Sequence, residues 1–130
     1  MGAKFLNPDG MSKPTGYTHV VEVSGTGRTI YIAGQLGLRA DGSLGEDFRT
    51  QAEQAFKNLE TAMAAVGGGL EHIVKVTYFL VDIGYLPVMR EIRNHHFTKG
   101  PLPASTAVAI TALALPNAVF EVEAIAFIPS

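Results

Sequence analysis

The ten residues VFEVEAIAFI, from Val119 to Ile128, decide the fold of this chain because their alternation defines the two faces of a β-strand. One face carries only apolar side chains, those of Phe120, Val122, Ala124, Ala126 and Ile128. We expect this face to lie in the core, beneath a layer of helices. The opposite face carries Val119, Ile125 and Phe127 and is apolar except for Glu121 and Glu123.

Glu121 and Glu123 need an explanation, because a buried and unpaired carboxylate is costly and tends to take up a proton. The two side chains therefore lie in water, pair with a cation or line a pocket. Lys75 is a candidate partner, since it alternates with Thr77 and Phe79 on the facing side of a strand predicted over Ile73 to Val81. An ion pair at an interface and a catalytic role for either glutamate stay equally open.

The apolar residues around the two glutamates also need a cover. The sequence predicts only two helices, and both are needed on the core side of the sheet. An oligomer in which several copies pack these outer faces together would bury them.

Two helices are expected on the basis of apolar residues at steps of three and four. The first runs from Glu46 to Val66 and ends at Gly67, with Ser43 and Glu46 as its capping box. The second covers Leu86 to Phe97 and is followed by Pro101 and Pro103, which stop a helix.

The remaining elements are strands. A hairpin is predicted from Thr18 to Val23 and from Thr29 to Ala33, joined at Gly25-Thr26-Gly27, with a possible edge strand over Lys4 to Asn7. A further strand is expected from Ala104 to Leu113. The order ββ-α-β-α-ββ predicts an α+β fold, with two helices on one face of a mixed sheet.

The composition excludes several classes of protein. The chain has 130 residues, of which 47% are hydrophobic and 17% charged, so residues 1–130 are expected to form one ordered domain. The absence of cysteine excludes disulfides, a thiolate nucleophile and a cysteine-type zinc site. A net charge of −2 without a basic stripe argues against nucleic acid as a partner. We expect a cytoplasmic protein without a membrane partner, because neither a secretory signal nor an apolar run of about 18 residues is present.

Other candidate motifs are weak. Gly25-Thr26-Gly27 lacks the third glycine of a dinucleotide fingerprint and the lysine of a P-loop. His95 and His96 would point about 100° apart on a helix, which does not suit one metal ion. We therefore expect no metal and no cofactor. Arg90 and Arg93 are interpreted first as solvated charges of the second helix.

Several segments together resemble the RidA/YjgF/UK114 family over almost the whole chain. Besides the helix from Glu46 to Val66, they are Gly16-Tyr17, Ile32 to Gln35 (IAGQ), Ile73 to Thr77 (IVKVT), Pro103 to Thr106 (PAST) and Val119 to Ala126 (VFEVEAIA). The resemblance implies a chorismate-mutase-like α+β fold. It also implies a homotrimer whose three sheets build a central barrel, with the helices outside and a ligand cleft between each pair of neighbouring subunits.

The resemblance implies an activity as well. The best-known members hydrolyse reactive enamines and imines to 2-keto acids and ammonia, and older family labels are translation inhibitor and endoribonuclease. Tyr17 corresponds to the family's pocket tyrosine, and Gly34 follows the strand whose backbone faces the ligand. Glu121 matches the glutamate that positions or activates the attacking water.

Three positions depart from the family pattern or vary within it. The imine-hydrolysing members have an arginine directly after Pro-Ala, whose planar fork grips the substrate carboxylate, and this chain has Ser105 there. The small residue two positions later is Ala107. Arg90 stands where the family has an asparagine in the second helix.

The sequence supports three functional hypotheses. In the first, the chain hydrolyses a C=N bond, with Tyr17 and Glu121 holding substrate and water and Arg90 replacing the missing arginine as the clamp for a carboxylate. In the second, the cleft binds a small metabolite or a partner protein without turnover, as the loss of arginine at Ser105 suggests. The third is RNA cleavage, which rests only on the older label and which the net charge disfavours.

Overall fold

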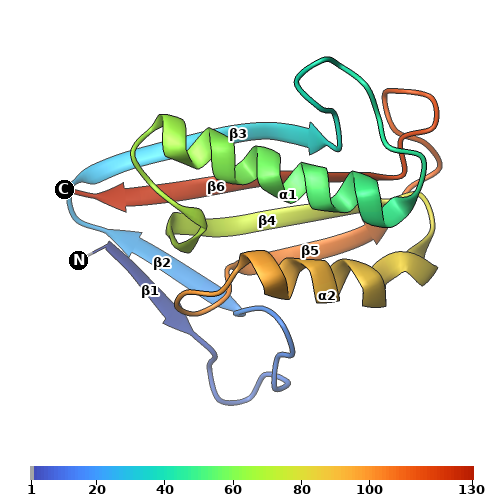
Figure 1. The fold of residues 1–130 in the computed structure, drawn as a ribbon. Coiled ribbons are helices and arrows are strands. Elements are labelled where there is room, and N and C mark those ends of the chain that lie inside the picture. The colour runs from blue at the N-terminus through green and yellow to red at the C-terminus, as the bar shows by residue number, and fades with distance from the viewer. Residues whose placement is uncertain (1) are drawn as a thin grey trace.

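The computed structural model describes residues 2–130. Two α-helices and six strands follow one another along the chain, with two short 3-10 helices (Figure 1). Their order and bounds are β1 (Gly2–Leu6), β2 (Val20–Ser24), β3 (Gly27–Leu36), α1 (Phe48–Ala65), η1 (Leu70–His72), β4 (Ile73–Leu80), η2 (Ile83–Tyr85), α2 (Leu86–His96), β5 (Ala104–Ala109) and β6 (Phe120–Pro129).

The main sheet has four strands in the order β3-β6-β4-β5. The β4–β5 pair is parallel and the other two pairs are antiparallel, so the sheet is mixed, as the sequence predicts. Both helices lie on the same face of this sheet, with α1 over β3 and β6 and α2 beside it, nearer to β5 (Figure 1). The predicted α+β fold class is therefore confirmed.

The core lies between this sheet and the helices. On β6, Phe120, Val122, Ala124 and Ala126 are at most 3% exposed, which confirms the predicted core face of the strand. The apolar stripe of α1 meets them with fully buried side chains, among them Ala55, Phe56, Leu59 and Met63. Burial of such side chains is the main favourable term in the folding of a domain of this size.

The far face of the sheet is open except at one end, where Phe127 of β6 is buried. Tyr31 on β3 is 77% exposed, Val108 on β5 is exposed, and Ile125 on β6 is half-buried. Both α-helices of residues 2–130 lie on the other face of the sheet (Figure 1). The expectation that further copies of the chain cover this face stays a prediction.

The predicted hairpin between Thr18 to Val23 and Thr29 to Ala33 is wrong. β2 pairs with β1 over five residues in a separate two-stranded sheet, whereas β3 pairs with β6. At Gly25, with φ of +83°, the chain passes from one sheet to the other. Local alternation identifies a strand but does not specify which strand it pairs with. Here β3 pairs with β6, which comes much later in the chain.

The start of α1 also differs from the prediction. Asp47, rather than Ser43, caps the helix, and its Oδ1 accepts a 2.8 Å hydrogen bond from the Thr50 N–H. Ser43 is held in the preceding turn instead, where its N–H and hydroxyl donate to Asp41 Oδ1. The glycine end of the helix is as predicted, because the Gly68 N–H donates to the Met63 carbonyl at 2.9 Å.

The strand β5 is shorter than the predicted Ala104 to Leu113. After Ala109 only the Ile110 N–H still bonds to the sheet, donating to the Leu80 carbonyl at 2.8 Å. Leu80 is the last residue of β4, so the chain beyond Ile110 has no neighbour to pair with.

Candidate functional site

Four of the six predicted site residues line one small pocket, of about 40 Å³, on the helix side of the sheet. They are Tyr17, Arg90, Ser105 and Ala107. The pocket lies where the loop before β2 meets α2 and the first half of β5. Gly16, Tyr78, Met89 and Arg93 are also in its lining. The structure thus brings together predicted residues from three distant parts of the chain.

Two hydrogen bonds hold the Gly16-Tyr17 loop against the start of β5. The Thr18 hydroxyl donates to the Leu102 carbonyl at 2.6 Å, and the Thr18 N–H donates to the Pro103 carbonyl at 3.2 Å. Thr18 is itself buried, so both bonds are shielded from water. They place Tyr17 within reach of the pocket that Ser105 lines.

The register of β5 directs Ser105 and Ala107 to the helix side. Their partners on β4 are Val76 and Tyr78, whose side chains lie in the core. Thr106 between them points to the open face. Ser105 therefore faces α2, and with it the side chains of Arg90 and Arg93.

The interpretation of Arg93 as a solvated charge is wrong, since this residue is only 6% exposed. It follows Met89 by four residues and so shares the buried face of α2. Burial lowers the pKa of Arg93, and the positive charge of Arg90 acts in the same direction. Arg90 is exposed at the rim of the pocket. Arg93 is the residue that the sequence prediction missed, although its place in the apolar stripe was a signal of its burial.

Gly16 provides the surface on which the Arg93 guanidinium lies. A Cβ at Gly16 would be 2.8 Å from Nη2 and 3.0 Å from Nη1 of Arg93, so the guanidinium would have to shift. Gly16 also has φ of +84°, a conformation that favours glycine. Gly16 thus suits the backbone conformation of this loop and leaves the Arg93 guanidinium in its observed position.

The other two predicted site residues, Gly34 and Glu121, are in contact at a second place. The β3–β6 register shifts between Ile32 and Gln35, and Gly34 lies in this irregularity. A side chain on Gly34 would overlap the Glu121 carboxylate, so the glycine leaves room for the observed position of this carboxylate. Partial burial raises the pKa of Glu121, and the neighbouring charge of Glu123 raises it further.

Lys75 is not the partner of either glutamate. Its ammonium donates to the Thr106 hydroxyl at 2.9 Å and to the Val76 carbonyl at 3.1 Å, and it makes no ion pair within residues 2–130. Burial lowers the pKa of Lys75, which the charge of Glu123 partly opposes. Glu121 is therefore left without a cation in this part of the molecule.

The pocket of Tyr17 and Ser105 and the contact between Gly34 and Glu121 lie on opposite sides of the sheet. Glu121 pairs with Phe79 of β4 and points to the open face, whereas Tyr78, the partner of Ala107, points to the helices. One chain alone therefore does not bring Glu121 to the pocket of Tyr17 and Ser105.

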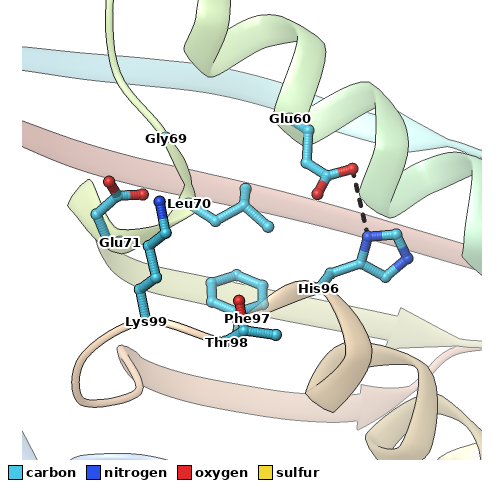
Figure 2. A pocket seen from close by; sticks show the side chains of 8 residues that line it. All are labelled: Glu60, Gly69, Leu70, Glu71, His96, Phe97, Thr98 and Lys99. Carbon is cyan, nitrogen blue, oxygen red and sulfur yellow. Dashed lines mark ion pairs between the residues drawn. The ribbon is translucent and has the colours of Figure 1, made fainter.

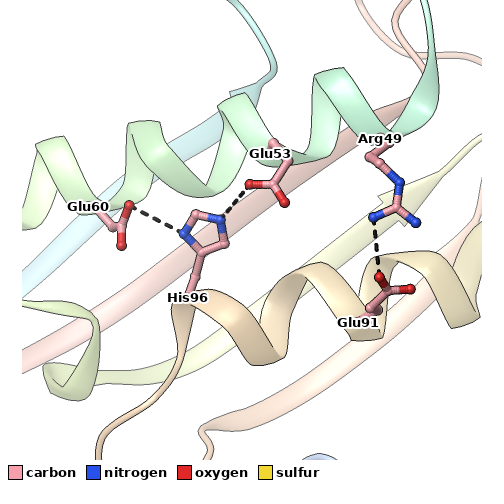
Figure 3. A network of polar contacts seen from close by, with 5 residues as sticks. All are labelled: Arg49, Glu53, Glu60, Glu91 and His96. Carbon is pink, nitrogen blue, oxygen red and sulfur yellow. Dashed lines mark hydrogen bonds and ion pairs between the residues drawn. The ribbon is translucent and has the colours of Figure 1, made fainter.

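A larger hollow, of about 260 Å³, contains none of the predicted site residues. Figure 2 shows it between the end of α2, the end of α1 and η1, lined by Glu60, Gly69, Leu70, Glu71, His96, Phe97, Thr98 and Lys99. His96 is already bridged to two carboxylates of α1: Nε2 lies 3.0 Å from Glu53 Oε2, and Nδ1 lies 3.3 Å from Glu60 Oε1 (Figure 3). We interpret this cluster as a structural link between the helices.

Two further features are absent from residues 2–130. No group of three histidine or acidic side chains is placed there to share a metal ion. Neither helix of the described chain has the length and apolar character needed to cross a bilayer.

Comparison with known proteins gives the family. The family model described as Endoribonuclease L-PSP matches residues 10–128. The RutC family protein YjgH of Escherichia coli is 36% identical over 105 residues, which are 80% of this chain and 79% of that protein. The chain belongs to the RidA/YjgF family.

Other members of the RidA family support this placement. A 2-iminobutanoate/2-iminopropanoate deaminase of Mus musculus is 39% identical over 114 residues, covering 85% of this chain and 79% of that protein. The crystal structure of the conserved Rid family protein YyfB from Yersinia pestis superposes with a TM-score of 0.87 at 30% identity, over 98% of this chain and 100% of that one. The chorismate-mutase-like fold expected from the resemblance is thereby confirmed.

Proposed function

We propose that this chain is a RidA-type hydrolase that cleaves the C=N bond of a reactive 2-imino acid and releases ammonia and a 2-keto acid. The observation that carries the proposal is the single pocket formed by Tyr17, Arg90, Ser105 and Ala107. Relatives named 2-iminobutanoate/2-iminopropanoate deaminase support the class of reaction.

Hydrolysis of an imine needs a water molecule and a group that moves its proton. The water oxygen attacks the imine carbon, the π electron pair of C=N moves to the nitrogen, and the nitrogen takes up a proton. The hydroxyl proton of the resulting carbinolamine then moves to the nitrogen as the C–N bond breaks, so ammonia leaves and C=O forms. Glu121 is suited to accept the proton of the water and pass it to the nitrogen, because its pKa is raised toward neutral pH.

The site is completed by a second subunit. Glu121 with Gly34 lies on the open sheet face and the pocket lies on the other side, so one chain holds two separate halves. In a homotrimer that covers the open face, Glu121 of one subunit meets the Tyr17 pocket of its neighbour. Cyclic assembly of this kind repeats one interface three times and gives three equivalent clefts.

The proposed function is tested with imines generated in the assay. Freshly produced 2-aminoacrylate or 2-iminobutanoate is offered, and keto acid and ammonia are measured against buffer. We expect acceleration by the wild-type protein and a loss of about 100-fold or more in Glu121→Gln. Glu22→Gln, on the exposed part of β2, is the matched control and should keep full activity. Wild-type protein no faster than buffer would contradict the proposal for these substrates.

Binding without turnover is the second candidate function. It is favoured by Ser105, which lines the pocket without the charge that the imine-hydrolysing members have at this position. A ligand of this kind would raise the melting temperature by mass action. Stabilisation by a compound that the protein then consumes would exclude this alternative.

A further inference from the structure

The geometry points to Arg93 as the buried anchor of an anion site, in which a ligand carboxylate bonds to Arg93 and the Tyr78 hydroxyl while Arg90 closes the site from the rim. The inference rests on the proposed function, because it names the groups that hold the carboxylate of the 2-imino acid. It moves the carboxylate clamp from β5, where Ser105 stands, to the facing helix α2.

Arg93 is a buried cation without a charged partner. Its side chain donates only to Asn94 Oδ1, from Nε at 3.2 Å and from Nη2 at 3.0 Å, and this acceptor is a neutral amide. No carboxylate of residues 2–130 lies within ion-pair distance of it. A buried guanidinium is costly unless an anion and hydrogen bonds compensate it, so this arrangement favours an anionic ligand.

Two hydrogen-bond donors in the pocket are unused. Neither Arg93 Nη1 nor the Tyr78 hydroxyl bonds to any group of residues 2–130, although Tyr78 is only 2% exposed. No fully enclosed side-chain nitrogen or oxygen of the same residues lacks a hydrogen bond. Both atoms therefore reach open space, and the pocket is the space that both residues line. An acceptor placed there would satisfy both donors.

The charges around the pocket are of one sign. Arg90 and Arg93 both line it, and they lie close enough for their positive charges to repel each other. No aspartate or glutamate is in the lining. One anion between the two arginines would remove this repulsion and receive charge-assisted hydrogen bonds from both.

The size of the pocket indicates which part of the ligand enters. One water molecule needs about 10–15 Å³ of such a cavity. The 40 Å³ found here therefore admit a group of a few heavy atoms, such as a carboxylate, and leave the rest of the ligand outside. The hydroxyls of Tyr17 and Ser105 lie at the same pocket and are available to the second carboxylate oxygen or to the atoms that follow it.

The site is tested first by binding, with 2-oxobutanoate titrated into the intact protein by calorimetry. Arg93→Lys keeps the charge but loses the planar fork, and we expect binding at least tenfold weaker. Arg90→Gln should weaken binding about threefold to tenfold, because this group is at the exposed rim. Arg49→Gln, an exposed arginine paired with Glu91 at 3.4 Å, is the matched control and should bind like the wild type. The neutral 2-oxobutanamide should not distinguish the wild type from Arg93→Lys.

Moving the arginine from position 93 to position 105 tests where the anion lies. Arg93→Met should abolish measurable 2-oxobutanoate binding, and the double variant Arg93→Met/Ser105→Arg should recover it to within about tenfold of wild type, because residue 105 lines the same pocket. A double variant that binds as weakly as Arg93→Met would contradict the shared pocket. Circular dichroism and sedimentation establish that each variant is folded, and Arg93→Lys decides the question if Arg93→Met is not.

The outcomes separate the anion site from the enzyme. Undiminished 2-oxobutanoate binding in Arg93→Lys, absence of binding to the wild type, or tighter binding of inorganic phosphate than of 2-oxobutanoate would each overturn the carboxylate site. Arginine-dependent binding without imine hydrolysis would keep the anion site and overturn the enzyme. Imine hydrolysis with unchanged KM in Arg93→Lys would keep the enzyme and overturn the anion site. The proposal itself expects KM in this variant to rise at least tenfold with little change in kcat.

Discussion

Gly16 and Gly34 each leave room for a functional side chain. The Arg93 guanidinium lies against Gly16, and the Glu121 carboxylate occupies the space where Gly34 would carry a Cβ. Both glycines belong to segments that resemble the RidA family, and the structure gives the physical reason for each of them. A larger residue at either position would displace the side chain that lies there, and at Gly16 the positive φ also favours glycine.

Replacement of Gly16 by alanine should therefore affect stability and binding together. The positive φ of +84° costs about 1 kcal/mol, and the new methyl group displaces Arg93, so keto-acid binding should weaken at least tenfold. Gly42→Ala is the matched control, with the same φ of +84° but nothing within 4 Å of the new Cβ. It should lose similar stability and bind normally. Equal binding by both variants would show that Gly16 does not position Arg93.

The pKa of Glu121 predicts the acid limb of the pH profile. Because burial and then Glu123 raise this pKa, the ionised form that activates water is lost at a higher pH than for an ordinary glutamate, whose pKa is about 4.3. Glu123→Gln removes one cause and should move the acid limb of kcat/KM to lower pH. Glu22→Gln should leave the limb in place. A limb unchanged by Glu123→Gln would argue against Glu121 as the titrating group.

The same shift has a consequence for folding stability. The folded chain binds the Glu121 proton more tightly than the unfolded chain does, because the pKa is raised in the folded state. The contribution of this group to stability therefore falls as the pH rises from the ordinary pKa through the raised one. In Glu121→Gln this part of the pH dependence should disappear, which urea unfolding at several pH values would measure.

At the scale of elements, the sequence predicts the strands and helices better than it predicts their partners. Alternation alone predicts the core face of β6, which is buried as expected, whereas Phe127 on the opposite face is also buried. The pairing of β2 with β1 and of β3 with β6 depends on residues far apart in the chain, which local patterns do not specify. The cap of α1 was misplaced because Ser43 and Asp47 are both good capping residues and only the turn at Asp41 decides between them.

In the candidate site, too, local sequence patterns predict some residues but not the contacts between distant parts of the chain. Tyr17, Arg90, Ser105 and Ala107 were predicted from motif positions, and the structure brings them together. The burial of Arg93 was missed because a charged residue next to an apolar stripe normally lies at its edge, where the charge reaches water. The loop at Gly16 that covers its guanidinium comes from a distant part of the chain, so the burial could not be inferred from the helix alone.

The link between α1 and α2 gives a test at this scale. His96 is bridged to Glu53 and Glu60 and stacks on Phe56 at a ring distance of 5.4 Å, so His96→Ala should cost about 1–3 kcal/mol of folding stability. The Arg49–Glu91 pair joins the same helices (Figure 3), but both side chains are more than half exposed. Arg49→Ala should therefore cost at most about 0.5 kcal/mol. Urea unfolding compares them, and equal losses would contradict this interpretation.

At the scale of the whole molecule, the open sheet face is the feature that one chain does not explain. A hollow of about 510 Å³ lies over β3, β6 and β4, with Tyr31, Lys75, Glu123 and Ile125 in its lining. An apolar and partly charged face of this kind is typical of a surface that another chain covers. In the proposed homotrimer this face is the interface that carries Glu121 to the pocket of the neighbouring subunit.

A substitution on this face should separate folding from assembly. Tyr31→Asp places a charge at a position that is 77% exposed in one chain, so the chain itself should fold normally. The charge would be buried in the trimer and should weaken association at least tenfold. Sedimentation velocity would measure a shift toward monomer with a native circular dichroism spectrum, and imine hydrolysis should fall in parallel. A fully active Tyr31→Asp monomer would contradict the shared site.

The most direct test of the account is subunit complementation between Glu121→Gln and Arg93→Met, assayed at a low imine concentration at which each pure variant has little activity. When the two variants are co-expressed and form mixed trimers, about a quarter of the clefts combine an intact Glu121 with an intact Arg93 from different subunits. We predict that imine hydrolysis reappears at about this fraction of the wild-type rate. If each site lay within one chain, every site would carry one defect, and mixed trimers with no more activity than the separate variants would contradict the account.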